Sequence, residues 1–325
     1  MDANVRAYAG VKKRRPNVAL VVVTRDRPDL LARYTLPSLE RISCEPAEIV
    51  IVDQSAGPDT YELVSDLPGV RVLRSAPGLS RGRNLAVAET DSPFIVFTDD
   101  DVEFGPGWLE RVERLFDEPT VGAVCGRGVD SLGRPLPFKP AGTYRYPASP
   151  FGLGHGFNVA FRRAALEQVG PFDERLGAGA PVPAAEDTDM LYRVMKAGWA
   201  ARCDDGITVR HHSWRSAEQE RAAHRNYGVG FAAQTAKHLR KRDLAAARVA
   251  ASEVAGHLFW LAVSAARGDR SALVLQLSWG QGAFAGARVL RQGLPSVPPP
   301  PEPLPLEPSR EDGRFRRTMS ARQAL

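Results

Sequence analysis

Three consecutive carboxylates, Asp99, Asp100 and Asp101, follow directly after the apolar run Phe94–Thr98. A buried strand that ends in adjacent carboxylates brings several negative charges to one edge of a sheet, where their repulsion is costly unless a cation lies between them. Oxygen ligands on a short loop suit Mg²⁺ or Mn²⁺, and such ions keep open positions for substrate phosphates. The triplet therefore predicts a site for a metal and a nucleotide. An isolated aspartate triplet is more often a solvated acidic turn, so the prediction depends on the residues that accompany it.

Two further apolar runs end in polar residues in the same way. Val18–Val23 leads into Thr24 and Asp26, and Glu48–Val52 leads into Asp53. Runs of β-branched residues without alternation are typical of strands buried on both faces, as in a parallel sheet covered by helices. Ligands of such sheets bind beyond the carboxyl ends of the strands. The polar residues after all three strands are therefore expected along one edge, where they form a site.

Helical stretches separate these strands and complete a βαβ pattern. One begins near Pro28, and Pro37 is expected to end or kink it. Another covers Asp59 to Leu67. The fold class predicted from this alternation is α/β.

The segment Pro77–Asn84 opens a further helix, with Ser80 as its expected N-cap. Arg81 and Arg83 stand beside this helix start, where unpaired amides and positive charge attract anions together. The segment alone is equally consistent with an ordinary capped helix that carries solvated arginines.

Five blocks of the sequence resemble the inverting family 2 glycosyltransferases of the GT-A fold. The blocks are Thr24-Arg-Asp-Arg27, Val52-Asp-Gln-Ser55, Gly78-Leu-Ser-Arg-Gly-Arg-Asn84, Phe97-Thr-Asp-Asp-Asp101 and Gly107-Trp-Leu109. The resemblance runs from about residue 18 to residue 212. It implies a GT-A domain, with a mixed sheet flanked by helices, that uses a nucleotide-sugar donor linked to UDP, GDP or dTDP together with Mn²⁺ or Mg²⁺.

The resemblance assigns one group of residues to this donor and its metal. They are Thr24, Asp26, Asp53, Arg83, Asp99, Asp100 and Asp101. Thr24 and Asp53 would hold the nucleotide base, and Arg83 would add positive charge near the diphosphate. Asp101 would be the usual metal ligand, with Asp99 beside it and the earlier carboxylates facing the ribose or the donor sugar. Gln54 departs from the family pattern, which often has a second Asp there, and this leaves the base and ribose contacts open.

An acidic pair in the second half of the chain supplies the expected catalytic base. Glu186 and Asp187 precede a helix that continues to Gly198. Position alone favours Asp187 as an N-cap, where its charge contributes about 0.3–1 kcal/mol. The family has a Glu-Asp pair here whose Asp is the general base, so the resemblance implies Asp187 as the catalytic base and Glu186 as an acceptor contact. Asp189 is expected to be either a helix-surface charge or a support for these two residues.

Two adjacent histidines follow the predicted strand segments Trp199–Cys203 and Ile207–Arg210. Neighbouring residues of a strand point to opposite faces, so only one of His211 and His212 can reach a metal. The family resemblance favours His211. An imidazole in an oxygen-rich site would favour Mn²⁺.

The chain has 325 residues, of which 43% are hydrophobic, and this is enough for one large α/β core with a helical extension. The expected organisation is a polar segment at residues 1–16, a GT-A catalytic domain at 17–215, a helical region at 216–293 and a disordered tail rich in Pro and Arg at 294–325. Residues 128–153 form a long connection that is a candidate acceptor loop. Cys44, Cys125 and Cys203 form no metal or disulfide pattern, which fits a reducing compartment.

The sequence favours a cytoplasmic protein. The N-terminus lacks an apolar signal core, and the longest apolar stretch, about Val254 to Ala266, is shorter than the roughly 18–20 residues of a membrane span. The basic patch Lys237–Arg242 next to aromatic helices suits peripheral contact with an anionic membrane. A helical subdomain packed on the catalytic core explains the same residues.

The predicted reaction is the transfer of a sugar, with inversion, to a hydroxyl of a glycan, a lipid-linked molecule or a small molecule. A sugar-nucleotide pyrophosphorylase would share the sheet and the carboxylates, but it should carry a Gly-rich phosphate loop directly after its first strand. The net charge of +5 and the pI of about 9.3 also suit a nucleic-acid binder. The clearest basic clusters, Lys12–Arg15, Lys237–Arg242 and the tail, lie outside the catalytic half, so no nucleic-acid partner is expected.

Overall fold

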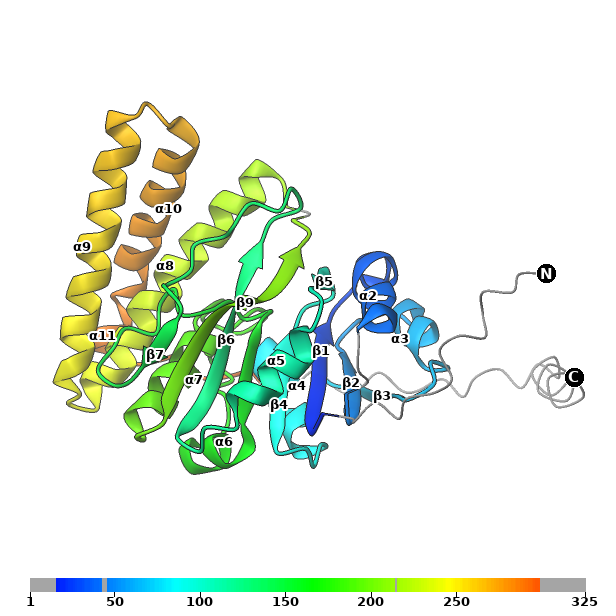
Figure 1. Ribbon diagram of the computed structural model, residues 1–325. Coiled ribbons are helices and arrows are strands. Elements are labelled where there is room, and N and C mark those ends of the chain that lie inside the picture. Colours follow the sequence, from blue (N-terminus) through cyan, green and yellow to red (C-terminus); the bar gives the residue numbers. More distant parts are fainter. Residues whose placement is uncertain (1–15, 43–45, 214, 299–325) are drawn as a thin grey trace, which may run out of the picture.

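The computed structural model describes residues 16–42, 46–213 and 215–298, and within them a mixed sheet is flanked by helices (Figure 1). A group of long helices from the C-terminal part of the chain stands beside this α/β unit. The α/β class predicted from the sequence is confirmed. Residues 1–15 of the expected segment 1–16 and most of the expected tail 294–325 lie outside the described residues.

The described residues contain one nine-stranded sheet in the order β3-β2-β1-β4-β8-β6-β9-β5, with β7 paired to β9. The strands are β1 (Val18–Thr24), β2 (Glu48–Asp53), β3 (Val70–Arg74), β4 (Phe94–Thr98), β5 (Val102–Phe104), β6 (Val121–Val129), β7 (Gly142–Tyr144), β8 (Val159–Arg162) and β9 (Ala200–His211). The first four strands of this order are parallel to one another, whereas β8 is antiparallel to both β4 and β6. The parallel half therefore presents the carboxyl ends of β1, β2 and β4 at one edge.

The helices of the α/β unit are α1 (Pro28–Leu30), the π-helical η1 (Leu31–Thr35), α2 (Leu36–Arg41), α3 (Asp59–Val64), α4 (Leu79–Ala88), α5 (Trp108–Leu115), α6 (Arg163–Val169) and α7 (Glu186–Lys196). One face of the sheet packs against α4, α6 and α7, and the opposite face packs against η1, α3 and α5. Strand β1 contributes alternate residues to the two cores, as a strand covered on both faces must.

Three details differ from the sequence predictions. The helical run that starts at Pro28 continues beyond Pro37 to Arg41, because a π-helical turn just before the proline accommodates its missing N–H. Helix α3 ends at Val64, three residues before the predicted end. The two short strands predicted between Trp199 and Arg210 form one strand, β9, with an irregular register against β6.

The C-terminal helices are α8 (Ala217–Arg240), α9 (Leu244–Ala266), α10 (Arg270–Gly286) and the short α11 (Val289–Gln292). Helices α8 and α10 pack at backbone contact: a Cβ atom placed on Gly282 of α10 would lie 1.9 Å from the carbonyl oxygen of Arg225 in α8. Helices α9 and α10 form a hairpin at the outer side of the molecule (Figure 1).

Helix α9 is longer than the apolar stretch Val254 to Ala266 that the sequence analysis compared with a membrane span. That stretch started at Val254, but the alanine-rich residues from Leu244 onward belong to the same helix. By length and composition alone this 23-residue helix could cross a membrane, and it is the one such helix in the described residues. Only 11% of its most apolar stretch is buried, so it is unlike the core helix of a globular domain.

Candidate donor and catalytic site

Three polar strand ends meet at one edge of the sheet, as predicted. Thr24 at the end of β1 pairs in register with Asp53 at the end of β2, and the hydroxyl of Thr24 donates to Oδ2 of Asp100 over 2.6 Å. Asp26 joins the loops that follow these two strands, because its amide donates to Ser55 and its carboxylate accepts from the amide of Ala56. The edge thus carries Thr24, Asp26, Asp53 and the aspartate triplet together.

Asp53 is fully buried, and only one of its carboxylate oxygens is hydrogen-bonded within the described residues. Oδ1 accepts from the amide of Ser55 over 2.8 Å, whereas Oδ2 accepts no hydrogen bond and has Arg74 Nε 3.8 Å away. A buried carboxylate oxygen without a donor is costly, so the free Oδ2 is suited to a donor group from a ligand.

Gln54 does not replace the second aspartate of the family pattern in a ligand contact. Its side-chain amide donates to Ser75 Oγ and to the carbonyl oxygens of Ala76 and Gly78. The amide of Gly78 in turn donates to Gln54 Oε1. The side chain therefore fixes the loop that leads into α4.

The aspartate triplet is not a solvated turn, since Asp100 and Asp101 are fully buried and Asp99 is partly buried. Burial raises the pKa of Asp100 to about 7, against the opposing effects of Arg27 and Thr24. Burial and the charge of Asp99 likewise raise the pKa of Asp101 to about 7. These shifts express the unfavourable energy of placing several carboxylates in one buried site.

A group of three ligand atoms lies at this edge. One atom from each of Asp99, Asp101 and His211 is within 4.8 Å of the others, and His211 Nε2 lies 3.4 Å from Asp101 Oδ1. This Oδ1 is buried and accepts no hydrogen bond from the described residues. Clustered carboxylates, an imidazole and an unpaired buried oxygen are the donor set that a divalent cation prefers. The residues therefore fit the metal expected from the sequence.

The second histidine points elsewhere. His212 stacks on the ring of Tyr34, with centroids 3.8 Å apart, and its Nε2 lies 3.3 Å from Oε2 of Glu103. His212 lies one residue beyond the end of β9, and the structure brings His211 rather than His212 to Asp99 and Asp101.

Helix α4 delivers Arg83 to the site, but its cap is not the predicted one. Gly78 occupies the N-cap, with a positive φ of 133°, and the Ser80 hydroxyl donates to the carbonyl oxygen of Leu176 instead. Arg83 is buried and donates to Glu186 Oε1 over 3.2 Å and to the carbonyl oxygen of Gly156 over 3.0 Å. Arg81 binds Glu174 and Pro77, so the two arginines have different partners.

Glu186 and Asp187 form the first turn of α7, directly after Ala185. Asp187 is therefore not the N-cap, and its Oδ1 accepts from the amide of Thr188 over 2.7 Å. A Cβ atom placed on Gly156 would lie 3.3 Å from Asp187 Oδ2 and 3.6 Å from Glu186 Oε1, so both carboxylates face the loop before β8.

The acidic pair has raised pKa values. Burial and the neighbouring charge of Asp187 raise the pKa of Glu186 to about 7, and burial raises the pKa of Asp187 while Arg83 opposes the shift. The charge of Asp99 adds to both shifts, which places the pair and the aspartate triplet in one electrostatic environment. A carboxylate whose pKa moves towards neutrality is a stronger general base.

Two residues of the site were not assigned from the sequence. Arg27 Nε lies 3.1 Å from Asp100 Oδ2, and its position in the block Thr24-Arg-Asp-Arg27 was the available signal. His155 stacks on Phe157, which stacks on His211, so it supports the metal-ligand group from behind. Burial lowers the pKa of His155 to about 4, which keeps its ring neutral.

The candidate acceptor loop is attached to the C-terminal helices. Its strand β7 pairs with β9, and the hydroxyl of Tyr146 donates to Asp243 Oδ1 over 2.9 Å. Asp243 is the N-cap of α9 and also accepts from Tyr192 and Lys196 of α7. The loop, α7 and α9 therefore meet at a single carboxylate.

Comparison with known proteins agrees with this geometry. Residues 19–170 match the model of the family "Glycosyl transferase family 2". The chain is 25% identical, over 66% of its length and 72% of the relative, to the O-antigen chain rhamnosyltransferase WbaN of Salmonella anatum. It is 27% identical, over 63% of its length and 79% of the relative, to the N-acetylglucosaminyl-diphospho-decaprenol L-rhamnosyltransferase of Mycobacterium tuberculosis.

Among solved structures, the chain is similar to the mannosyltransferase PcManGT from Pyrobaculum calidifontis, which was determined in complex with GDP-mannose and Mn²⁺. The TM-score is 0.60 at 18% identity, and the match covers 84% of this chain and 88% of that one. This likeness confirms the predicted GT-A fold. The family match includes Thr24, Asp53, Arg83 and the aspartate triplet, whereas Glu186, Asp187 and His211 lie beyond it.

Proposed function

Residues 19–170 belong to Glycosyl transferase family 2, so the chain is a glycosyltransferase, and we propose that it transfers a sugar to an acceptor hydroxyl with inversion. One observation carries the proposal: in the loop before β8, Gly156 lies beside Glu186 and Asp187, and the next residue, Phe157, stacks on His211 of the candidate metal group. The donor edge of the sheet and the acidic pair of α7 are therefore two sides of one site.

The donor nucleotide would bind at the carboxyl ends of β1 and β2. Asp53 Oδ2, a buried oxygen that accepts no hydrogen bond from the described residues, suits an N–H group of a base, with Thr24 and Asp26 beside it. Asp99 and Asp100 would face the ribose or the donor sugar. Arg83 adds a positive charge to the same pocket, although Glu186 partly neutralises it.

Asp99, Asp101 and His211 would hold the divalent cation. A bound Mn²⁺ or Mg²⁺ neutralises the negative charge that develops on a leaving diphosphate. The imidazole ligand favours Mn²⁺ over Mg²⁺.

Asp187 would act as the general base. Its carboxylate removes the proton of the acceptor hydroxyl while that oxygen bonds to the anomeric carbon and the bond from this carbon to the diphosphate breaks. A single displacement of this kind inverts the anomeric configuration. Glu186 would contact the acceptor.

The relatives guide the choice of substrates. Two are rhamnosyltransferases, and the mycobacterial one is named for a diphospho-decaprenol acceptor. We therefore expect a rhamnose donor, with dTDP-rhamnose as the first candidate, and a lipid-linked sugar as the acceptor. GDP-mannose and UDP-sugars are the competing donors to test.

The same acceptor chemistry supports peripheral contact with the cytoplasmic face of a membrane. Leu258, Phe259 and Trp260 of α9 are each more than half exposed, and Arg267 and Arg270 flank the turn between α9 and α10. Aromatic and aliphatic side chains next to arginines suit the interface of an anionic bilayer.

A donor screen tests the proposed function. The full chain is melted with dTDP-rhamnose, GDP-mannose and several UDP-sugars, each with Mn²⁺ and with EDTA, because a ligand bound only by the folded state raises the melting temperature. We expect one donor class to stabilise the protein in the presence of Mn²⁺ but not of EDTA. The same donor should release its nucleoside diphosphate during incubation. If no donor either stabilises the protein or loses its sugar, the proposal is wrong.

A further inference from the structure

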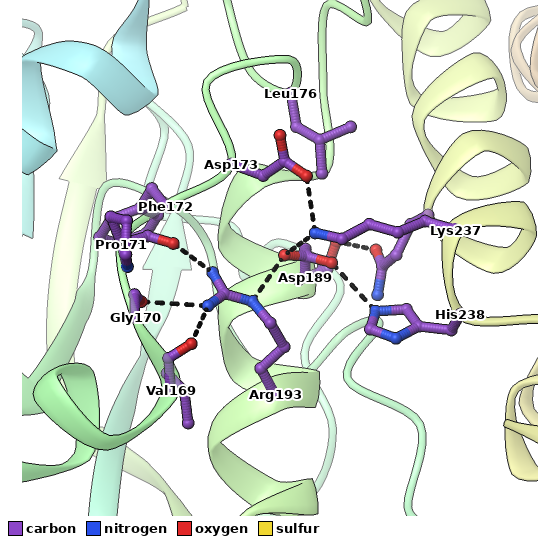
Figure 2. Close-up of polar contacts among 12 residues, drawn as sticks. Val169, Gly170, Pro171, Phe172, Asp173, Leu176, Asp189, Arg193, Lys237 and His238 are labelled. Atoms are coloured by element: carbon purple, nitrogen blue, oxygen red, sulfur yellow. Dashed lines mark hydrogen bonds and ion pairs between the residues drawn. The ribbon is translucent and has the colours of Figure 1, made fainter. Parts of the chain in front are cut away.

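The first turn of α7 has two faces with different partners. Glu186 and Asp187 face the candidate site, whereas Thr188 is hydrogen-bonded to α8. Asp189 also faces α8, where it meets Lys237 and His238 (Figure 2). The hydroxyl of Thr188 donates to Gln234 Oε1 over 2.7 Å. The two residues that would perform the chemistry are therefore followed directly, within the same turn of helix, by the two residues that α8 holds.

Asp189 is the centre of a buried ionic network. Its Oδ2 accepts from Lys237 Nζ over 2.8 Å and from Arg193 Nε over 2.9 Å, and its Oδ1 lies 3.0 Å from His238 Nε2. Burial would raise the pKa of Asp189, but His238, Lys237 and Arg193 together hold it well below its usual range. The sequence alternative of a helix-surface charge is therefore wrong, because Asp189 is a buried carboxylate that stays ionised.

The network extends to the loop before α7 (Figure 2). Lys237 Nζ also lies 2.8 Å from Asp173 Oδ2, and Asp173 accepts two hydrogen bonds from the side chain of Arg175. Arg193 donates to the carbonyl oxygens of Val169, Gly170 and Pro171. These ion pairs and hydrogen bonds join α7 to the loop before it and to α8.

Close packing holds the residue just before the turn. Ala185 has a φ of 75°, a left-handed conformation that a residue with a side chain adopts only when its surroundings enforce it. Gly230 of α8 lies against it: a Cβ atom placed on Gly230 would be 2.9 Å from Ala184 Cβ and 3.0 Å from Ala185 Cβ.

The α8 residues in these contacts are Gly230, Gln234, Lys237 and His238. Their spacing of four, three and one places them along one face of the helix. We propose that this face, the α8 clamp, positions the catalytic base by fixing Ala185, Thr188 and Asp189 on either side of Asp187. This inference rests on the proposed function, and the clamp residues are positioning residues that do not touch the substrate. The C-terminal helices are thus part of the catalytic unit.

The test compares two close glycine contacts of α8. Gly230 of α8 packs against the residues before α7, whereas Gly286 of α10 packs against α8 itself. In Gly230→Ala the new methyl group would press on Ala184 and Ala185, whereas in Gly286→Ala, on α10, it would lie 2.7 Å from the carbonyl oxygen of Val229 and 2.9 Å from Ala232 Cβ. Both variants should lower the melting temperature by a similar amount. A misplacement of about 1 Å can cost about 100-fold in rate, so we expect kcat to fall at least about 10-fold in Gly230→Ala alone.

The readout separates positioning from folding. Turnover is measured as nucleoside diphosphate released by water from the donor identified in the screen, with saturating donor and Mn²⁺, well below the melting temperature. The Kd of the donor is measured separately and should stay unchanged, because the donor edge lies on β1, β2 and β4. If Gly230→Ala retains as much kcat as Gly286→Ala, the clamp has no positioning role.

A second pair of variants keeps the proposal testable if Gly230→Ala does not fold. Thr188→Val has nearly the same shape but cannot donate to Gln234, whereas Thr188→Ser keeps the hydroxyl. We expect kcat to fall in Thr188→Val and to recover in Thr188→Ser, and equal rates would overturn the clamp. Asp187→Asn is measured in parallel. If Asp187→Asn is fully active, the proposed base is wrong. If Asp187→Asn is inactive but Thr188→Val is fully active, only the clamp is contradicted.

Discussion

Arg83 Nη1 lies 3.2 Å from Glu186 Oε1, and both residues are buried although 103 positions separate them in the sequence. This pair joins α4 to the first turn of α7 across the candidate site. The guanidinium opposes the effect of burial on the pKa of both Glu186 and Asp187. Arg83 therefore favours the ionised form of the acidic pair at the pH where a base must accept a proton.

The pH dependence of turnover should report this interaction. As the proposed base, Asp187 must be ionised, so the rate should rise with pH through its raised pKa, with the acidic limb displaced above the usual range for an aspartate. The charge of Arg83 lowers the pKa of Asp187. The negative charges of Glu186 and Asp99 act on Asp187 in the opposite direction. In Arg83→Met the midpoint of the acidic limb should move to higher pH. Arg81→Met, on the same helix but bound to Glu174, is the control and should keep the wild-type midpoint.

Asp187→Asn tests the base itself. Asparagine keeps the volume of the side chain but cannot accept the proton, so we expect kcat to fall by about 10²- to 10⁴-fold with donor binding intact. The charge lost from the first turn of a helix is worth at most about 1 kcal/mol, too little to explain such a loss by unfolding. Asp59→Asn removes an exposed first-turn charge from α3 and should leave turnover unchanged. Near-wild-type turnover of Asp187→Asn would move the search for the base to Glu186.

Asp101→Asn tests the metal site. Loss of this ligand should abolish the rise in melting temperature that Mn²⁺ produces in the wild-type protein, which corresponds to about 2.7 kcal/mol when Mn²⁺ is at 100 times its Kd. The fold should survive, because the substitution relieves repulsion among buried carboxylates. Asp91→Asn, an exposed aspartate before β4, is the matched control. An Mn²⁺ response that persists in Asp101→Asn would contradict the assignment.

Sedimentation with vesicles tests the membrane contact of α9. The full chain should sediment with anionic vesicles at low salt and detach as salt rises, since each nearby Lys or Arg contributes about 1 kcal/mol that salt screens. Replacing Phe259 and Trp260 by Ser should abolish sedimentation. Leu132→Ser removes an even more exposed apolar residue from the α/β unit and should not abolish sedimentation. Failure to sediment with anionic vesicles at low salt would favour a helical subdomain without a lipid surface.

The sequence predicted the parts of the site that depend on strand ends. The carboxyl ends of β1, β2 and β4 must meet once the strands are parallel and adjacent, so the joint position of Thr24, Asp53 and the aspartate triplet follows from three short patterns. Strand alternation predicted only that one of His211 and His212 could reach the carboxylates, and the family resemblance favoured His211, which lies beside Asp99 and Asp101.

Contacts between distant segments could not be predicted. The partners of Asp189 on α8 are 48 and 49 positions away, and no local pattern marks Lys237 and His238 as anything but a basic surface patch. Gln54 is similar, since its three acceptors lie on the loop before α4. Ser80 was expected to cap its own helix, but the nearby carbonyl oxygen of Leu176 is a better-placed partner for its hydroxyl.

The glycine contact between α8 and α10 restricts how an acceptor can approach. Close contact at these glycines restricts sliding of α8 against α10, so if the α8 clamp holds α7, the exposed apolar residues of α9 and the carboxylate of Asp187 would move together. Helix α8, with 24 residues, gives this rigid unit a length of about 36 Å. On a bilayer, the enzyme would present its pocket at one height and one angle. A lipid-linked acceptor would then reach the base by diffusion in two dimensions, whereas a soluble sugar of the same chemistry would gain nothing from the surface.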